Sequence, residues 1–170
     1  MNPTALAKGD AAQTVTLQHF VLNDGKFVAA VRDARNVPTP AGNGGPTFGY
    51  ALTAQRKTPQ PVAVTLPSTK TGKLASLSSV DLYAFTLTTA TGLDVVIKAA
   101  RKVPASTLDS RLSIFETTAK KDIGTNDDAS GSTTDSQLGG TLPAGNYVVV
   151  VENEGTNATD LSYEIDFTLR

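Results

Sequence analysis

The sequence lacks the residue types on which several kinds of functional site depend. Its 170 residues include no cysteine, no tryptophan and a single histidine, His19. The absence of cysteine excludes disulfides, thiol nucleophiles and cysteine-ligated zinc sites. A Ser-His-Asp triad needs a histidine, and His19 lies in a strand-like run before Phe20, where an ordinary strand or turn histidine is the simpler interpretation. We therefore expect that this chain is not an enzyme.

The sequence also lacks an excess of either charge and any long apolar run. Fifteen Lys and Arg residues are interspersed with sixteen Asp and Glu residues, whereas a nucleic-acid-binding protein shows a clustered basic excess. No stretch approaches the roughly 18 apolar residues of a membrane span. Residues Met1–Leu6 lack the basic and apolar regions of a signal peptide, so we expect an exported form to be a mature or recombinant one. Abundant Thr, Ser, Gly and Ala favour a secreted or cell-surface bacterial module.

Short strands separated by turn residues are what the sequence does contain. Residues 142–151, Leu-Pro-Ala-Gly-Asn-Tyr-Val-Val-Val-Val, place an apolar run directly after a turn. Valine is β-branched and packs better on a pleated surface than in a helix. Residues 80–87 and 163–169 alternate apolar and polar side chains, as half-buried strands do. No segment has a helical period, and the pattern predicts an all-β sandwich with the 142–151 run as a central strand.

Part of this pattern occurs twice. Residues 22–33 align without a gap on residues 142–153, and Tyr50-Ala-Leu-Thr aligns on Tyr163-Glu-Ile-Asp. Strands are expected at 13–20, 27–31 and 50–55, which would match only the last three strands of the later unit. An incomplete sandwich leaves open edges. This segment would pack on the complete domain, be completed by another chain through strand addition, or belong to a longer tandem array.

A succession of short motifs resembles a known family. The motifs are Gly72-Lys-Leu, Asp81-Leu-Tyr-Ala-Phe-Thr-Leu, Leu112-Ser-Ile-Phe, Asn126-Asp-Asp, Leu142-Pro-Ala-Gly-Asn-Tyr and Tyr163-Glu-Ile. In this order and spacing they resemble the bacterial pre-peptidase C-terminal domain, which is similar in plan to the collagen-binding domains of clostridial collagenases. The resemblance implies a jelly-roll-like antiparallel β sandwich, non-catalytic, attached to secreted or surface proteins. It also implies that some members bind calcium, collagen or polysaccharide.

The repeat and the resemblance together divide the chain. We expect an arm at residues 1–12 and a partial β-sandwich repeat with about three extra strands at 13–57. Two prolines in Arg56-Lys-Thr-Pro-Gln-Pro61 break strand pairing, so residues 58–67 are expected to be a linker. A short strand at 61–66 would lead from it into the next unit. The complete sandwich, similar to the pre-peptidase C-terminal domain, would span 68–170, with a turn at Ser68–Gly72.

Calcium is the one cofactor that the sequence suggests. Asn126, Asp127, Asp128 and Asp135 supply side-chain oxygens between Gly124 and the start of the next strand, and calcium prefers six to eight oxygen ligands. The spacing is not that of an EF-hand loop. The simpler alternative is that these residues bond local backbone amides in turns. A second acidic group, Glu152-Asn-Glu154, is a weaker candidate.

These observations favour a non-catalytic interaction module of a larger extracellular protein. Its partner would be an extracellular protein or a polysaccharide. One alternative is a structural subunit of a filament or oligomer, completed by strand exchange between identical subunits. Another is a removable pro-segment of a secreted hydrolase. Tyr83, Tyr147 and Tyr163 are expected in the core rather than in a ligand platform, because each falls on the apolar side of an alternating strand.

Overall fold

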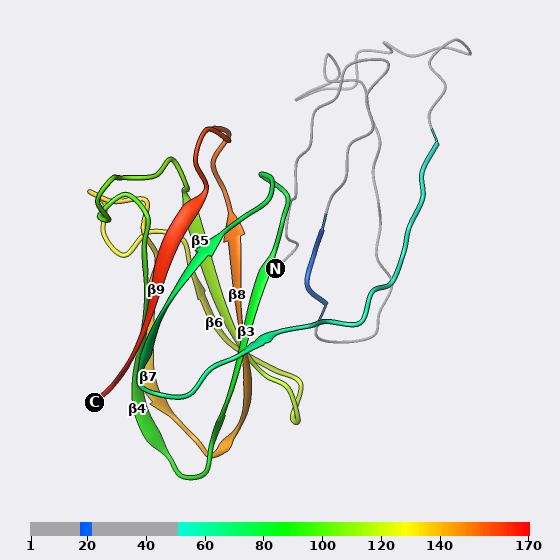
Figure 1. The fold of residues 1–170 in the computed structure, drawn as a ribbon. Coiled ribbons are helices and arrows are strands. Elements are labelled where there is room, and N and C mark those ends of the chain that lie inside the picture. The colour runs from blue at the N-terminus through cyan, green and yellow to red at the C-terminus, as the bar shows by residue number, and fades with distance from the viewer. Residues whose placement is uncertain (1–17, 22–50) are drawn as a thin grey trace.

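The computed structural model describes residues 18–21 and 51–170, and this part of the chain is built from strands and loops (Figure 1). The strands are β1 Val62–Ala63, β2 Ser68–Lys73, β3 Asp81–Leu87, β4 Thr91–Lys98, β5 Ser110–Glu116, β6 Lys121–Asn126, β7 Gln137–Leu142, β8 Gly145–Asn153 and β9 Ser162–Leu169. Among these residues no helix is long and apolar enough to cross a membrane. The all-β prediction is confirmed.

The strands form two sheets that pack as a sandwich (Figure 1). One sheet has five strands in the order β1-β3-β8-β5-β6, and the other has four in the order β2-β9-β4-β7. All pairings are antiparallel except that of β1 with β3, which is parallel. The run predicted as a central strand is β8, which lies between β3 and β5. Consecutive strands mostly change sheets, so the loops cross from one layer to the other at the two ends.

The core is made by side chains at alternate positions of both sheets. Tyr83 and Phe85 of β3 face Phe167 of β9, with ring centroids 6.1 Å apart in both pairs. Phe85 also stacks on Tyr147 of β8 at 5.3 Å. Tyr83, Tyr147 and Tyr163 are all buried, as the alternating pattern predicts. Each large aromatic ring buries about 150–250 Å², so these rings supply much of the stabilisation of the sandwich.

Gly72 on β2 makes room for the ring of Tyr163, whose hydroxyl has two hydrogen-bond partners. Gly72 lies opposite Tyr163, and a Cβ at Gly72 would overlap the Tyr163 ring. The Tyr163 hydroxyl donates to Asp81 Oδ2 at 2.6 Å and lies 2.9 Å from the Tyr83 hydroxyl. Burial, with Asp81 and Tyr83 beside it, raises the pKa of Tyr163 far above its usual value. Gly72 in the Gly-Lys-Leu motif is therefore needed for close packing against a buried, neutral tyrosine.

The edges of the sandwich differ from the sequence prediction in two places, β2 and residues 51–55. The expected turn Ser68–Gly72 is instead strand β2, paired with β9 over six residues. The short strand expected at 61–66, inside the linker 58–67, is present as β1, and Val64 just after it is buried in the core. Residues 51–55, part of an expected strand, are exposed and belong to no strand. Most of the proposed N-terminal repeat lies outside the described residues, so the repeat stays a prediction.

Candidate functional site

The loop between β4 and β5, residues 99–109, projects an apolar tip from a fixed base. Val103 is 98% exposed, and Pro104 and Ala105 beside it are exposed as well. At the two ends of the loop, Ala99 and Leu108 are fully buried. The loop connects one sheet to the other, since β4 belongs to the four-stranded sheet and β5 to the five-stranded sheet. It therefore lies at one end of the sandwich, where a partner can approach.

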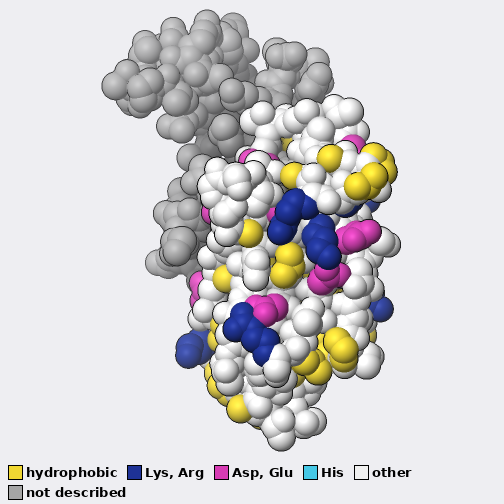
Figure 2. Space-filling view, turned by 90° about the vertical axis from the view of Figure 1, so that its left-hand side faces the viewer, with side chains coloured by type: hydrophobic (Ala, Val, Ile, Leu, Met, Phe, Trp, Pro, Cys, Tyr) yellow, Lys and Arg dark blue, Asp and Glu magenta, His cyan; other side chains and the backbone are white. Residues whose placement is uncertain are grey.

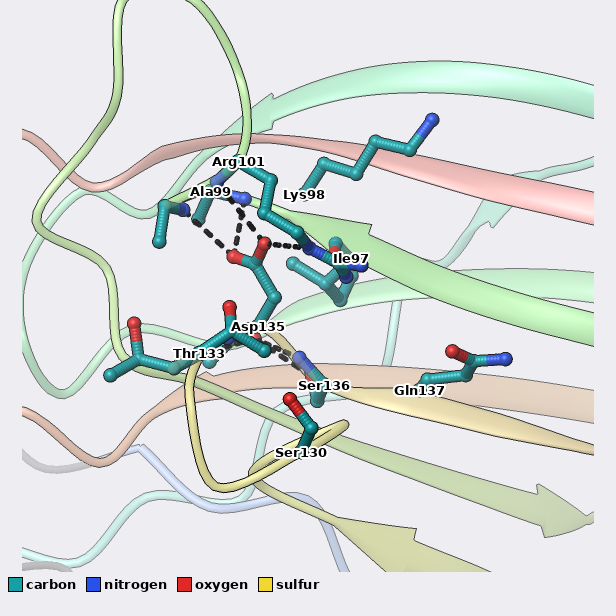
Figure 3. Close-up of polar contacts among 12 residues, drawn as sticks. Ile97, Lys98, Ala99, Arg101, Ser130, Thr133, Asp135, Ser136 and Gln137 are labelled. Atoms are coloured by element: carbon teal, nitrogen blue, oxygen red, sulfur yellow. Dashed lines mark hydrogen bonds and ion pairs between the residues drawn. The ribbon is translucent and has the colours of Figure 1, made fainter.

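A buried carboxylate, Asp135, fixes the start of this loop (Figure 3). Its Oδ1 accepts hydrogen bonds from the backbone N–H of Ala99 and of Ala100, both at 2.7 Å. Its Oδ2 accepts one from the backbone N–H of Arg101 at 3.2 Å and one from Arg101 Nε at 2.5 Å. Arg101 Nη2 also donates to the Ile97 carbonyl at 3.1 Å. Four donors on one fully buried carboxylate leave the loop base little freedom.

The electrostatics of Asp135 follow from this arrangement. Burial alone would raise the pKa of the carboxyl, because it penalises the charged form. The Arg101 guanidinium and the three backbone amides stabilise the charged form more strongly, so the pKa of Asp135 is lowered. The carboxylate is therefore ionised at neutral pH and paired with Arg101.

The other side of the loop is held by hydrogen bonds to the β8–β9 connection. Ser106 N–H donates to the Ala99 carbonyl at 3.0 Å, which closes the loop on itself. Thr107 donates to the Asp160 carbonyl from both its N–H, at 2.9 Å, and its hydroxyl, at 2.7 Å. Lys102 Nζ donates to the Pro104 carbonyl at 2.7 Å and lies 4.0 Å from Asp160 Oδ2. The exposed tip is thus presented by a stem that is bonded on both sides.

The four residues predicted to hold calcium, Asn126, Asp127, Asp128 and Asp135, have hydrogen-bond partners within the protein. Asn126 Oδ1 accepts from Gln137 N–H at 2.8 Å, and Asp127 Oδ1 accepts from Asp128 N–H at 3.0 Å. Asp135 is directed at the β4–β5 loop and Arg101 instead. Within residues 18–21 and 51–170, no three His, Cys, Asp or Glu side chains gather as a metal site requires. Calcium binding stays a prediction, and a higher melting temperature in millimolar calcium than in EDTA would support it.

The acidic residues near this loop influence one another without forming such a cluster. Partial burial raises the pKa of Asp109, and Asp128, Glu154 and Asp127 raise it further. Arg111 beside them donates to Glu154 Oε1 at 2.5 Å. The weaker candidate group at 152–154 is therefore occupied by an arginine, and its acidic side chains serve to balance that charge.

Sequence reasoning did not single out Val103 or Arg101. The available signal was a strand that ends at Lys98, followed by Ala-Ala-Arg-Lys-Val-Pro before the next strand. That composition indicates a loop, but it does not indicate that Val103 is exposed. The partner of Arg101 lies 34 residues further along the chain, and no local pattern links the two.

Comparisons with known proteins are consistent with the fold. No protein-family model matches the sequence, and no curated protein matches it. Among solved structures, the pre-peptidase C-terminal domain of the collagenase from Bacillus anthracis matches with a TM-score of 0.53 and 15% identity. That match covers 67% of this chain and 100% of the collagenase domain.

A periplasmic inhibitor of g-type lysozyme from Aeromonas hydrophila, PliG, also matches, with a TM-score of 0.49 and 15% identity. That match covers 65% of this chain and 96% of the inhibitor. At these identities the likeness concerns the fold alone. The chain contains a β sandwich with the fold of the pre-peptidase C-terminal domain, which its sequence motifs predicted.

Proposed function

We propose that this chain is a non-catalytic interaction module of a larger extracellular protein, secreted or held at the bacterial cell surface. The observation that carries the proposal is the β4–β5 loop, in which a 98% exposed valine is presented by a hydrogen-bonded base. The likeness in fold to the pre-peptidase C-terminal domain of a collagenase supports the same interpretation. We propose an extracellular protein or a polysaccharide as the partner.

A fixed loop suits binding because ordering a flexible one costs free energy on association. Each immobilised side chain costs roughly 0.5–1.5 kcal/mol at an interface. Here the bonds from Asp135 to Ala99, Ala100 and Arg101 hold the loop base before any partner arrives. Val103 and Pro104 supply apolar surface, and Arg101, with a side chain 44% exposed, supplies a nearby positive charge. This combination of an apolar anchor with a charged rim is common at protein interfaces.

Co-sedimentation of the full chain with collagen fibrils, and separately with an insoluble polysaccharide, tests the proposal. The variant Val103→Asp should lose binding, because a charge at the tip is costly to desolvate. Val62→Asp is the matched control, since Val62 is exposed on β1 and outside the loop. Equal binding by the two variants would show that the loop is not the contact. No binding to either material by the unchanged chain would contradict both proposed partner classes.

A second candidate function is that of a structural subunit that accepts a strand from an identical neighbour. Strand β1 covers β3 over two residues only, Val62 opposite Tyr83 and Ala63 opposite Ala84. Val64 N–H donates to the Ala84 carbonyl at 2.8 Å, so the backbone of Ala84 faces this edge. The backbone of Thr86, two residues on, faces the same way. Within the described residues the β1–β3 register ends at Ala84, which leaves an edge suited to strand addition.

Light scattering across a range of concentrations distinguishes the two functions. An interaction module should remain a monomer, whereas a strand-exchanging subunit should form larger species as the concentration rises. Thr86→Pro removes an edge-facing N–H without touching the β3–β8 hydrogen bonds, and proline is tolerated on edge strands. Larger species that vanish in this variant would favour the structural subunit. A monomer at every concentration would exclude it.

A further inference from the structure

The outer face of the five-stranded sheet is apolar along its middle. In β8, Tyr147, Val149 and Val151 face the core between the sheets. Val148 and Val150 alternate with them and therefore point outward. Their neighbours on the adjacent strands are Ala84 and Leu82 of β3 and Phe115 and Ser113 of β5. These six residues, Leu82, Ala84, Ser113, Phe115, Val148 and Val150, are called the outer patch below.

The outer patch is shielded from solvent although it lies outside the core. Val148 is 8% exposed, Val150 1% and Ser113 3%. A sheet in a two-layer sandwich packs one face on the core and usually exposes the other. Burial on both faces of β8 requires a further layer of chain over the outer patch.

The described residues place one segment of that layer. The ring of Phe20 lies 5.4 Å from the ring of Phe115, measured between centroids, with the planes inclined at 36°. That geometry is typical of favourable aromatic pairs. His19 Nδ1 lies 3.6 Å from Glu152 Oε1, at the end of β8. The segment Gln18–Val21, here called the N-terminal strap, therefore touches β5 and β8 on the same side of the sheet.

Gln18 attaches the strap to the segment that leads into β3. Its N–H donates to the Ser78 carbonyl at 3.2 Å, and its Oε1 accepts from Val80 N–H at 3.3 Å. Ser78 and Val80 lie in the segment that leads from the turn at residues 76–79 into β3. The strap is therefore bonded to the chain just before β3, while Val64 bonds Ala84 within β3. Side-chain packing and backbone hydrogen bonding both fix the position of the strap.

We propose that the outer patch is a docking surface for an extended segment, and that its occupant is the N-terminal strap of the same chain, anchored by Phe20. Phe20 supplies the apolar contact, Gln18 supplies bonds to exposed backbone, and His19 lies beside the carboxylate of Glu152. Arg111 Nε, 3.8 Å from the other oxygen of Glu152, faces His19 across that carboxylate. The strap would stay docked on the outer patch whether or not the sandwich binds an extracellular partner.

Cross-linking of the full chain tests which chain supplies the strap. The sequence has no cysteine, so His19→Cys with Glu152→Cys introduces the only two thiols. A short bismaleimide should join them within one chain, giving a monomer of altered mobility in a denaturing gel. The pair His19→Cys with Lys121→Cys is the control and should not form a link within one chain. Lys121 lies opposite Glu116, at the other end of β5 from Arg111, which pairs with Glu152. Products that are mainly dimers, formed between tagged and untagged chains, would overturn the assignment to the same chain.

Single substitutions test whether Phe20 is the anchor. Phe20→Ser should lower the melting temperature by about 4 °C or more and should increase binding of a hydrophobic dye, because the outer patch becomes accessible. Val21→Ser is the matched control, since Val21 is 43% exposed on the same strap. Equal melting temperatures and equal dye binding in the two variants would overturn the proposal. A cross-linked strap that retains its melting temperature when Phe20 is replaced would likewise show that Phe20 is not the anchor.

Discussion

The two outer faces of the sandwich present different kinds of side chain, apolar on one and charged on the other. The outer face of the five-stranded sheet presents valine, leucine and phenylalanine, and its centre is buried. The outer face of the four-stranded sheet presents charged side chains. Lys98 pairs with Asp166, and Arg170 pairs with Asp94. Figure 2, which views the side of the molecule that bears β4, β7 and β9 in Figure 1, shows Lys and Arg side chains beside Asp and Glu side chains.

The burial patterns of β8 and β9 show the same difference along single strands. In β9, Glu164 and Asp166 alternate with the buried Tyr163, Ile165 and Phe167, so one face meets water. In β8, residues 147–151 are buried without interruption. An unbroken apolar run therefore indicates a strand covered on both faces. The outer face of the four-stranded sheet, here called the open face, is charged and needs no covering layer. The outer face of the five-stranded sheet, here called the covered face, is apolar and needs one, and the N-terminal strap contributes to it.

A lysine placed on each face in turn should give the largest contrast. Val150→Lys on the covered face should destabilise the fold by at least about 3 kcal/mol, because it buries a charge beside apolar neighbours. Val96→Lys on the open face lies opposite Asp166 and should change stability by less than about 0.5 kcal/mol. Denaturant unfolding of both variants measures the difference. Similar losses in the two would show that the faces do not differ in exposure.

Removing the Asp135 carboxylate should have the next largest effect. Asp135→Asn replaces an acceptor of four hydrogen bonds by a group that also donates, which should cost about 3 kcal/mol. Asp128→Asn, at an exposed position, is the control and should cost less than about 0.5 kcal/mol. Thermal and denaturant unfolding measure both. A loss for Asp135→Asn no larger than that of the control would mean that the loop base is not held by this carboxylate.

Acid should weaken the open face and the loop base together. The Arg170 hydrogen bond lowers the pKa of Asp94. For Asp166, burial opposes ionisation, but Lys98 and Thr69 outweigh it and the pKa is lowered. A carboxyl with a lowered folded-state pKa stabilises the fold above its unfolded value, near 3.8, and this contribution is lost as the pH falls through the folded-state value. We expect stability to decline below about pH 4 and the decline to be shallower in Asp166→Asn. An unchanged slope in that variant would contradict the assignment.

The smallest expected effect concerns the Arg170–Asp94 pair. A double-mutant cycle with Arg170→Ala and Asp94→Ala should give only a small coupling, because the Arg170 side chain is 55% exposed and solvent screens the pair. Added salt should reduce this coupling through screening. A coupling that is larger and independent of salt would show that water and ions do not reach this ion pair on the open face.

The sequence was most informative where one strand carried a complete pattern. Strands β3, β8 and β9 could be predicted because aromatic and branched residues recur with a period of two or in one run. Strand β2, Ser-Thr-Lys-Thr-Gly-Lys, has no apolar side chain and becomes a strand only through its pairing with β9. Strand β6 was missed for a similar reason, since Lys-Asp-Ile-Gly-Thr-Asn has one large apolar residue.

The candidate site was harder to predict because its partners are distant in the chain. Asp135 was expected to join the nearby acidic residues at a cation. The fold instead brings it to Arg101 and to the amides of the β4–β5 loop. Likewise, Phe20 and Phe115 lie 95 residues apart, and no pattern in the sequence indicates that their rings are in contact. Local patterns predict strands, but contacts between distant residues depend on which strands become neighbours.

The contact between Phe20 and Phe115 is the most direct test of the covered face. Nuclear Overhauser effects between the two rings can be measured in the full chain, with isotope labels on one chain population only. The account predicts cross-peaks within one chain that persist on dilution. An absence of cross-peaks, or cross-peaks only between differently labelled chains, would contradict it.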